Sequence, residues 1–251
     1  MIDLHTHLLP GVDDGSPSVG VSVPVLERFA EHGVEIVVCT PHLDASRAKS
    51  APHDRHSEIL AELRNAAPPK PELRLGWEIM LDAPGVDLRD SRLALGGSTA
   101  VLVEFPRMMV PPSATDELFR LRMSGLVPVL AHPERYWGCT VAHVDEWRRA
   151  GTVIQMDVAG LFGSGPQASL ATALLEEGLV DVLASDTHGD ARALLPAKHW
   201  LEEIGAAEQA ELLTRRNAAH LLANEPVETV GPVERPRGML GRLKELLLGR
   251  R

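Results

Sequence analysis

Short apolar segments alternate with longer amphipathic ones along most of this chain, and an ionisable side chain stands at or just beyond the end of most apolar segments. The periodicity predicts β-strands at 2–7, 34–40, 73–78, 100–105, 126–132, 152–158 and 179–186. It predicts helices at 18–32, 54–66, 114–124, 142–150, 167–177, 191–204 and 207–223. Strands that alternate with helices in this way form parallel sheets with crossover helices. The chain is therefore predicted to have an α/β fold.

The positions of the ionisable residues favour a closed barrel over an open sheet. Six of the seven predicted strands carry such residues at or near the C-terminal end, namely His5 and His7, His42, Glu78, Glu104, His132, and Asp186 with His188. In a parallel barrel all of these ends surround one face, where barrel enzymes build their active sites. Strands far from the switch point of an open sheet could not all reach one pocket. We therefore predict a seven-stranded barrel, for which 251 residues is an ordinary length.

The side chains at the strand ends are those that bind divalent metals. His5 and His7 are two residues apart on a strand, so both imidazoles point to the same face. With Asp14 from the following loop, the set holds five histidines and four carboxylates, which is more than one ion can use. Zinc, manganese and iron fit these ligands, whereas calcium and magnesium fit poorly. Clustered ions of this kind activate water and hold phosphoryl oxygens, so we predict phosphoester hydrolysis at a multinuclear site.

Composition and short motifs exclude several other functions. A net charge of -10 argues against a nucleic-acid-binding surface. The first residues lack a basic region followed by an apolar run, so we expect a cytoplasmic protein. The two cysteines, Cys39 and Cys139, form no CxxC pair, and neither is followed six residues later by arginine. The phosphate-binding loop of cysteine-based tyrosine phosphatases is therefore absent from the sequence.

Seven motifs in the sequence together resemble one enzyme family. MIDLHTH, VDDG, TPH, GWE, VEFP, AHPERY and ASDTH follow the order and spacing of the PHP (polymerase and histidinol phosphatase) metal-dependent phosphoesterases. They are most similar to its CpsB/YwqE branch, bacterial protein-tyrosine phosphatases associated with capsule and exopolysaccharide synthesis. The resemblance extends from Met1 to about Asn224. It implies a distorted (β/α)7 barrel of PHP type with the metal site at the C-terminal ends of the strands.

The resemblance also implies cofactors and roles for individual residues. It implies two or three divalent ions, with Mn2+ as the first expectation and Fe or Zn as alternatives. One ion would be held by His5, His7, Glu78 and Asp186, a second by Glu78, Glu104 and His132, and a third by Asp14, His42 and His188. The candidate catalytic residues are Arg135, Arg192 and His42. Arg135 matches the phosphate-binding arginine of the HPER motif, whereas Arg192 stands one residue before the usual position of a second arginine, which is Ala193 here.

The implied substrate is phosphotyrosine on a bacterial tyrosine kinase of the polysaccharide export machinery. Two other functions stay open. A small-molecule PHP phosphoesterase, such as a histidinol-phosphate phosphatase, would share the metal ligands. A non-catalytic module that binds the kinase would retain them only for folding.

Several residues near the motifs are given no ligand role. Asp13 is expected to cap a turn. Asp157, at the end of the sixth predicted strand, is left out because the family pattern gives it no role. The other six histidines, His32, His53, His56, His143, His199 and His220, are expected on the surface.

The chain is expected to divide into a phosphoesterase barrel at 1–224 and, at 225–251, a linker with a basic amphipathic tail. A helical tail would place Leu240, Leu243 and Leu247 on one face. It would then suit peripheral contact with an anionic membrane or docking to a kinase. The equally weighted alternative is a disordered or self-packing end.

Overall fold

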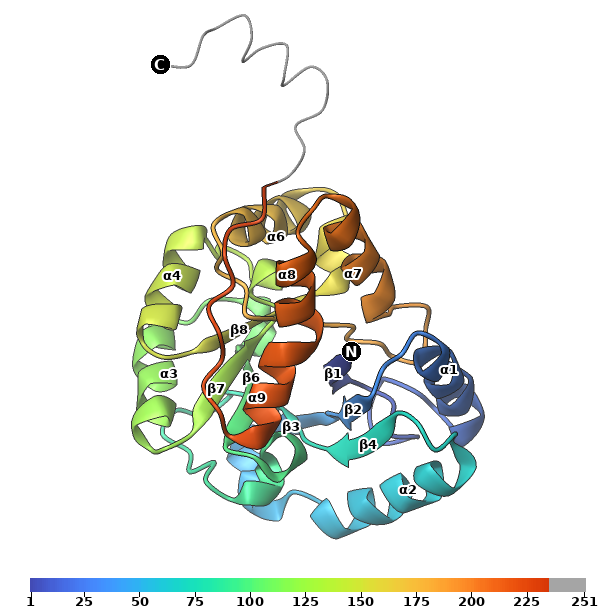
Figure 1. Ribbon diagram of the computed structural model, residues 1–251. Coiled ribbons are helices and arrows are strands. Elements are labelled where there is room, and N and C mark those ends of the chain that lie inside the picture. The colour runs from blue at the N-terminus through green and yellow to red at the C-terminus, as the bar shows by residue number, and fades with distance from the viewer. Residues whose placement is uncertain (235–251) are drawn as a thin grey trace, which may run out of the picture.

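A computed structural model, which describes residues 1–234, shows an α/β fold whose strands form two parallel sheets (Figure 1). The first sheet has the order β1 (Ile2–Thr6), β2 (Ile36–Cys39), β4 (Glu72–Leu75). The second has the order β3 (His42–Asp44), β5 (Glu78–Met80), β6 (Ala100–Glu104), β7 (Val127–Ala131), β8 (Val153–Asp157), β9 (Val182–Ala184). The α/β class and the parallel pairing are thus confirmed.

Each of the seven predicted strands is present, and two further short strands lie between them. The segment predicted as one strand at 73–78 ends at Leu75, and β5 begins at Glu78 in the other sheet. Between them Gly76 packs so closely that a Cβ there would lie 2.9 Å from Leu95 Cδ2. In the same way, β3 follows β2 and belongs to the other sheet. The described strands therefore form two separate hydrogen-bonded sheets, and the chain passes from one to the other between β2 and β3 and again between β4 and β5.

On the other side, β1 lies next to the end of β9. The backbone N–H of His7 donates to the Thr187 carbonyl at 2.9 Å, and that of Asp186 donates to the His5 carbonyl at 3.0 Å. These bonds hold residues 5–7 against residues 186–188, which come from the first and the last of the predicted barrel strands.

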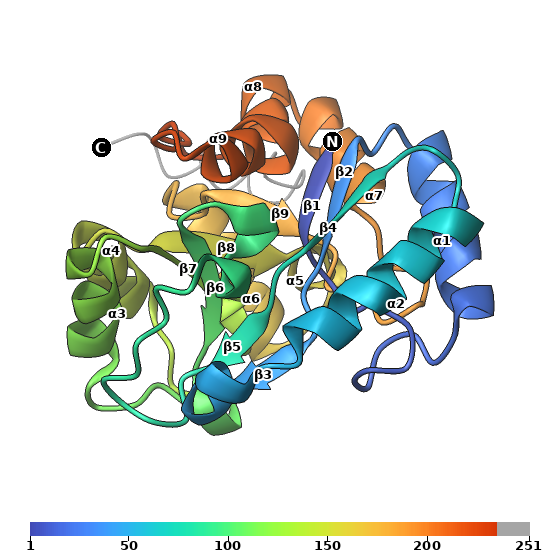
Figure 2. The same cartoon turned by 90° about the horizontal axis from the view of Figure 1, so that it is seen from below.

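The helices surround the sheets, with α1 and α2 beside β2 and β4 and with α3 and α4 beside β7 (Figure 2). Their bounds are α1 (Val19–Glu31), α2 (His53–Ala66), α3 (Ala114–Met123), α4 (Val141–Arg149), α5 (Val158–Phe162), α6 (Pro166–Glu176), α7 (Leu194–Glu203), α8 (Ala207–Glu211) and α9 (Asn217–Ala223). The helix predicted at 207–223 is present as α8 and α9 joined by a π-helical turn at Leu212–Arg216. None of the helices in the described part of the chain is long and apolar enough to span a bilayer.

Two hydrophobic clusters form the core. The larger lies between the strands and the surrounding helices. The smaller joins inward residues of both sheets, among them Leu4, Val38 and Leu102, with Ala218 and Leu221 of α9. Side chains from both sheets therefore meet in one interior, and α9 closes it at the end nearest the N-terminus (Figure 1).

The first ten residues of the expected linker, 225–234, lie against the helices. Val230 and Val233 are buried, the Val233 N–H donates to the Leu175 carbonyl at 3.1 Å, and Asn217 pairs with the backbone of Glu228. The boundary at residue 224 remains a prediction. The amphipathic tail lies outside the described residues.

Candidate metal centre

The nine predicted ligands come together at the C-terminal ends of the strands. Their donor atoms form four overlapping groups: His5, His7 and Asp186; His5, Glu78 and His132; His42, Glu78 and Glu104; and His7, Asp14, His42 and His188. In each group these atoms lie within 4.8 Å of one another. The sequence thus predicted the convergence of all nine side chains, whereas metal binding by them stays a prediction.

The most buried part of the site is a cage of two imidazoles and two carboxylates. The Nε2 atoms of His5 and His7 lie 3.2 Å apart. Oε2 of Glu78 lies 3.3 Å from each of them. Oδ1 of Asp186 lies 3.4 Å from the first and 3.3 Å from the second.

The outer hydrogen bonds of the two rings determine which nitrogens face the cage. His5 Nδ1 donates to Gln155 Oε1 at 3.0 Å, and His7 Nδ1 donates to Asp13 Oδ2 at 2.7 Å. Neutral rings with these protons turn their Nε2 lone pairs toward each other and toward two carboxylates. Four electron-rich atoms at this spacing need a cation among them, so the donor set fits a divalent metal.

The pKa values of the two histidines reflect the same demand for positive charge. Burial lowers the pKa of His5, but Glu78 and Asp186 outweigh burial and raise it to about 9. Burial also opposes charge on His7, while hydrogen bonds to Asp13, Asp186 and Glu78 raise its pKa to about 12. A metal ion in the cage would replace the protons that these shifts describe.

Glu78 links the cage to two further histidines. Its Oε1 lies 2.8 Å from His132 Nε2, and its Oε2 lies 2.9 Å from His42 Nδ1. Glu104 stands nearby, with Oε1 3.8 Å from the same His42 nitrogen. Burial and the neighbouring Glu78 raise the pKa of Glu104. Oε2 of Glu78 thus faces both the cage and His42 while Oε1 faces His132, so Glu78 could serve more than one ion.

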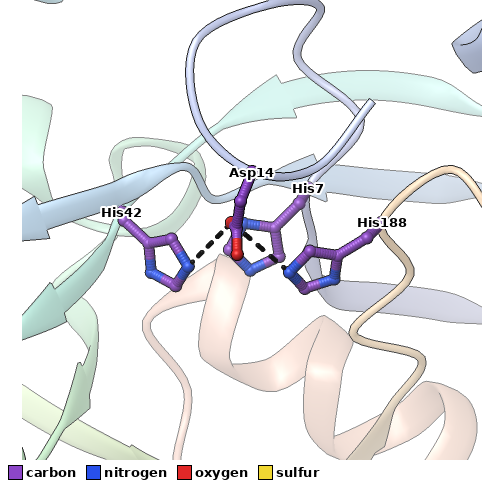
Figure 3. A group of neighbouring side chains, drawn as sticks. All are labelled: His7, Asp14, His42 and His188. Carbon is purple, nitrogen blue, oxygen red and sulfur yellow. Dashed lines mark ion pairs between the residues drawn. The ribbon is translucent and has the colours of Figure 1, made fainter. Parts of the chain in front are cut away.

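The third group lies at the solvent-exposed mouth of the site. Asp14 is 70% exposed, His42 is 42% exposed and His188 is 23% exposed. Figure 3 shows Asp14 between the two rings, with Oδ1 3.2 Å from His42 Nε2 and 3.6 Å from His188 Nε2. His7 stacks on His188 with ring centroids 4.2 Å apart, which joins this group to the buried cage.

Two of the predicted ligands occupy strained backbone positions. His132 has φ 35° and Asp186 has φ 48°, in the left-handed region that L-residues rarely adopt. Each follows the last residues of a strand, where the turn redirects the side chain into the site. Strain of this kind concentrates at functional sites, and the surrounding contacts must hold it in place.

Both predicted phosphate-binding arginines reach the cage. Arg135 Nη1 donates to Asp186 Oδ2 at 2.8 Å and to Asp157 Oδ2 at 3.2 Å. Arg192 Nη1 donates to the same oxygen of Asp186 at 3.1 Å, and its Nη2 lies 2.9 Å from His188 Nδ1. The two guanidinium groups therefore meet at one carboxylate, on the side opposite to that facing the histidine pair.

Sequence reasoning missed three residues that orient the ligands and the arginine. Asp13, expected only to cap a turn, also accepts the His7 hydrogen bond. Gln155 holds His5 and donates to Asp157 at 3.0 Å, and Asp157 holds Arg135. A signal was available, because Gln155 and Asp157 alternate along β8 as His5 and His7 do along β1.

The expectation that His56 lies on the surface is wrong. Its residue exposure is 6%, and its ring stacks on Trp77 with centroids 4.6 Å apart. His56 shares the inner face of α2 with Leu60 and Leu63, which are four and seven residues further along. That spacing was the signal for its burial.

Replacing Asp13 with alanine is expected to weaken metal affinity by about 10- to 100-fold, because His7 loses the partner that orients its ring. The affinity is measured by competition with a chelating indicator. The matched control is Asp87→Ala, which removes an exposed carboxylate whose ion-pair partner among residues 1–234 is Arg89. Equal affinities in the two variants would contradict the role given to Asp13.

Tyr136 fastens the loops that carry Glu104 and His132. Its buried hydroxyl donates to the Ala131 carbonyl at 2.9 Å and accepts the Phe105 N–H at 3.1 Å. Tyr136→Phe is expected to reduce the free energy of unfolding by about 1–3 kcal/mol, because two buried backbone groups lose their partner. Urea unfolding of the metal-loaded protein measures this, and an unchanged midpoint would contradict it.

Comparisons with known proteins find a family and relatives that this chain resembles over most of its length. The family model described as "Capsular polysaccharide synthesis, CpsB/CapC" matches residues 1–223. The tyrosine-protein phosphatase YwqE of Bacillus subtilis is 28% identical, over 90% of this chain and 93% of its own length. The tyrosine-protein phosphatase CpsB of Streptococcus agalactiae is 27% identical, over 89% of this chain and 99% of its own length.

Solved structures show the same fold. A structure from the work on YwqE from Bacillus subtilis and CpsB from Streptococcus pneumoniae, described as unique metal-dependent tyrosine phosphatases, superposes with a TM-score of 0.75. It is 25% identical and covers 94% of this chain and 100% of that one. An inactive dihydroorotase-like domain from Chaetomium thermophilum, 10% identical, gives a TM-score of 0.53 over 90% of this chain and 79% of that one. The latter likeness concerns the fold alone.

Proposed function

The chain belongs to the CpsB/CapC family of capsular polysaccharide synthesis, and from this premise we propose that it is a metal-dependent phosphatase that hydrolyses phosphotyrosine in proteins. The observation that carries the proposal is the cage in which two imidazole nitrogens and two carboxylates converge within 3.4 Å. The donor set needs a cation, and two arginines border it.

The fold proposed for this enzyme is the distorted (β/α)7 barrel. Support comes from the smaller hydrophobic cluster, in which both sheets contribute inward side chains to one interior. The bonds between β1 and the end of β9 support closure on that side. In a parallel barrel the strand ends surround one face, and that is where the nine candidate ligands lie.

We assign the metal ligands as the family resemblance implies. His5, His7 and Asp186 with Glu78 would hold one divalent ion. Glu78, Glu104 and His132, whose donor atoms fall in two groups that share Glu78, would hold a second. Asp14, His42 and His188 would hold a third at the mouth. Manganese is the proposed ion, with iron and zinc as alternatives that the same ligands accept. When bound, such ions supply a water activated as nucleophile and neutralise charge on the phosphoryl group.

Arg135 would bind the phosphoryl oxygens of the substrate. Its guanidinium is partly exposed and is oriented by two buried carboxylates, Asp157 and Asp186. A guanidinium matches the planar geometry of phosphate oxygens and stabilises charge that grows on them during phosphoryl transfer. Asp157 thereby acts as a positioning residue for Arg135.

Arg192 would join the phosphate once His188 holds a cation. A ring that presents Nε2 carries its proton on Nδ1, and His188 Nδ1 lies 3.0 Å from the Asp186 carbonyl that would accept it. That protonated nitrogen cannot also accept from Arg192 Nη2, 2.9 Å away. Nη2 would then be available to a bound phosphate, while Nη1 stays paired with Asp186 and Nε with Asp190.

The proposed substrate is phosphotyrosine on a protein of the capsule machinery, a bacterial tyrosine kinase in the first instance. The relatives named tyrosine-protein phosphatase and the family of capsular polysaccharide synthesis support this choice. A phosphorylated protein requires an accessible mouth, and the partly exposed Asp14 and His42 agree with that requirement.

The test is phosphate release by the manganese-loaded protein from three substrates: a phosphotyrosine peptide, a phosphoserine peptide and histidinol phosphate. The phosphotyrosine peptide is expected to have the highest kcat/KM. Preference for histidinol phosphate would support the small-molecule phosphoesterase instead. Turnover of none of the three by metal-loaded protein would support the non-catalytic module.

A further inference from the structure

A cavity of about 450 Å3 lies beside the outer metal group, and Asp14 and His42 form part of its wall. Its other walls come from the loop before α1, from the 3-10 helix at Ala45–Ser50 and from the start of α2. The apolar side chains that line it are Val12, Leu43, Pro52 and Trp77. The proposed ligands Asp14 and His42 thus share a cavity that is large enough for an aromatic ring and that has both polar and apolar side chains in its wall.

His56 is the buried polar residue of this cavity. Neither ring nitrogen has a hydrogen-bond partner within residues 1–234, and Nδ1 is sealed from solvent. Burial lowers the pKa of His56, which favours the neutral ring. Nε2 is not among the sealed atoms, so it is the ring nitrogen that an oxygen of a molecule in the cavity could pair with.

Arg47 lines the same cavity from its exposed rim. Its guanidinium makes no hydrogen bond or ion pair with any residue of the described chain, whereas the nearby Ser50 hydroxyl donates to its carbonyl at 3.1 Å. Asp44 also lines the cavity, so the cavity offers both a donor and an acceptor to a polypeptide. A free guanidinium at a cavity rim suits backbone carbonyls or acidic side chains of a bound peptide.

The cavity and the two arginines flank the outer metal group from different sides. Arg192 contacts His188, whereas the cavity includes His42, and these two rings lie on opposite sides of Asp14 (Figure 3). Neither Arg135 nor Arg192 lines the cavity. A phosphate held by the arginines and the ligands would therefore direct its ester group toward His42 and into the cavity.

We propose that this cavity is the leaving-group subsite, that it receives the aromatic ring of phosphotyrosine, and that His56 and Arg47 are specificity-determining residues within it. The inference rests on the proposed phosphotyrosine hydrolysis. The ring lies among the apolar side chains, His56 donates to an oxygen of the bound residue, and Arg47 contacts the polypeptide where it leaves the cavity.

The test fills the cavity from its rim. Ser50→Trp adds bulk at a position that lines the cavity, and Ser57→Trp adds the same bulk at an exposed position of α2 outside it. For Ser50→Trp, KM for a phosphotyrosine peptide is expected to rise at least about tenfold. The inhibition constant of inorganic phosphate should stay unchanged, because phosphate does not use the cavity. Ser57→Trp should change neither quantity.

A second pair of variants tests the polar residues. Arg47→Ala is expected to raise KM for the peptide about fivefold while leaving p-nitrophenyl phosphate unaffected, because the small ester has no polypeptide. Arg55→Ala, an exposed arginine of α2 outside the cavity, is the control. His56→Phe keeps the stacking on Trp77 and removes the N–H, and should raise KM for both substrates.

The outcomes separate the inference from the proposed function. If the wild-type protein hydrolyses phosphotyrosine but Ser50→Trp behaves as Ser57→Trp does, the subsite is wrong and the phosphatase assignment stands. If Ser50→Trp weakens inorganic phosphate as much as the peptide, the cavity belongs to the phosphate site and the inference is again wrong. If the wild-type protein with metal bound does not hydrolyse phosphotyrosine, the proposed function fails first.

Discussion

Glu78→Gln is expected to lower kcat for phosphotyrosine hydrolysis by about a thousandfold or more, the loss that follows when several kcal/mol of metal-dependent stabilisation are removed. Glu78 lies within 3.3 Å of four histidines, His5, His7, His42 and His132, and is itself buried. The amide keeps the shape of the side chain but loses the charge, and one of its two former acceptor atoms becomes a donor. It can therefore no longer bridge two cations.

Metal content separates this explanation from misfolding. The variant is expected to bind fewer ions per chain than the wild type while keeping its circular dichroism spectrum. Glu72→Gln, an exposed position at the start of β4, is the matched control and should keep both metal and activity. Full metal content together with wild-type kcat in Glu78→Gln would show that Glu78 is not a bridging ligand.

Arg135→Ala is expected to lower kcat/KM by about 100- to 1,000-fold, the loss found when a preorganised donor to the transition-state oxygens is removed. Arg135→Lys should recover only part of this loss, because an ammonium group cannot form two parallel bonds to a phosphoryl group. The inhibition constant of inorganic phosphate should rise in both variants. The measurement is steady-state kinetics with a phosphotyrosine peptide.

The removal of Arg135 also leaves Asp157 and Asp186 without their partner, so the two effects must be distinguished. Metal content is therefore measured in each variant, and only variants with wild-type content are compared. Arg89→Ala removes an exposed arginine whose ion-pair partner in the described part of the chain is Asp87, and it serves as control. An Arg135→Ala variant with full metal and wild-type kcat/KM would exclude a role in phosphate binding.

The sequence predicted those elements of the fold that depend on local patterns of apolar and polar residues. Alternating apolar segments and amphipathic helices are visible in the sequence, and the seven predicted strands and every described α-helix except the five-residue α5 followed from them. The three-residue strands β3 and β5 did not, because segments so short carry no periodicity. They form through pairing with each other, with Glu78 opposite His42, and this is a tertiary contact.

The candidate ligands were predictable because the C-terminal ends of parallel strands converge on one face. A residue's place at the end of a predicted strand therefore indicates that it lies on that face. The residues that orient these ligands were harder to predict. In the sequence, Gln155 and Asp157 look like ordinary polar residues. Their roles are visible only in the structure, where Gln155 contacts His5 of β1 and Asp157 contacts Arg135. His56 is buried because Trp77, from another segment, covers its ring. Such partners are set by packing across the fold, which a single sequence states only indirectly.

We propose that this chain hydrolyses phosphotyrosine with metal ions held by the nine converging side chains. The most direct measurement removes the metal with a chelator, confirms its absence by elemental analysis, and then follows phosphate release from a phosphotyrosine peptide as Mn2+ is added back. We predict no turnover without metal and recovery that saturates as two or three ions bind per chain. Undiminished hydrolysis by verified metal-free protein would contradict the account.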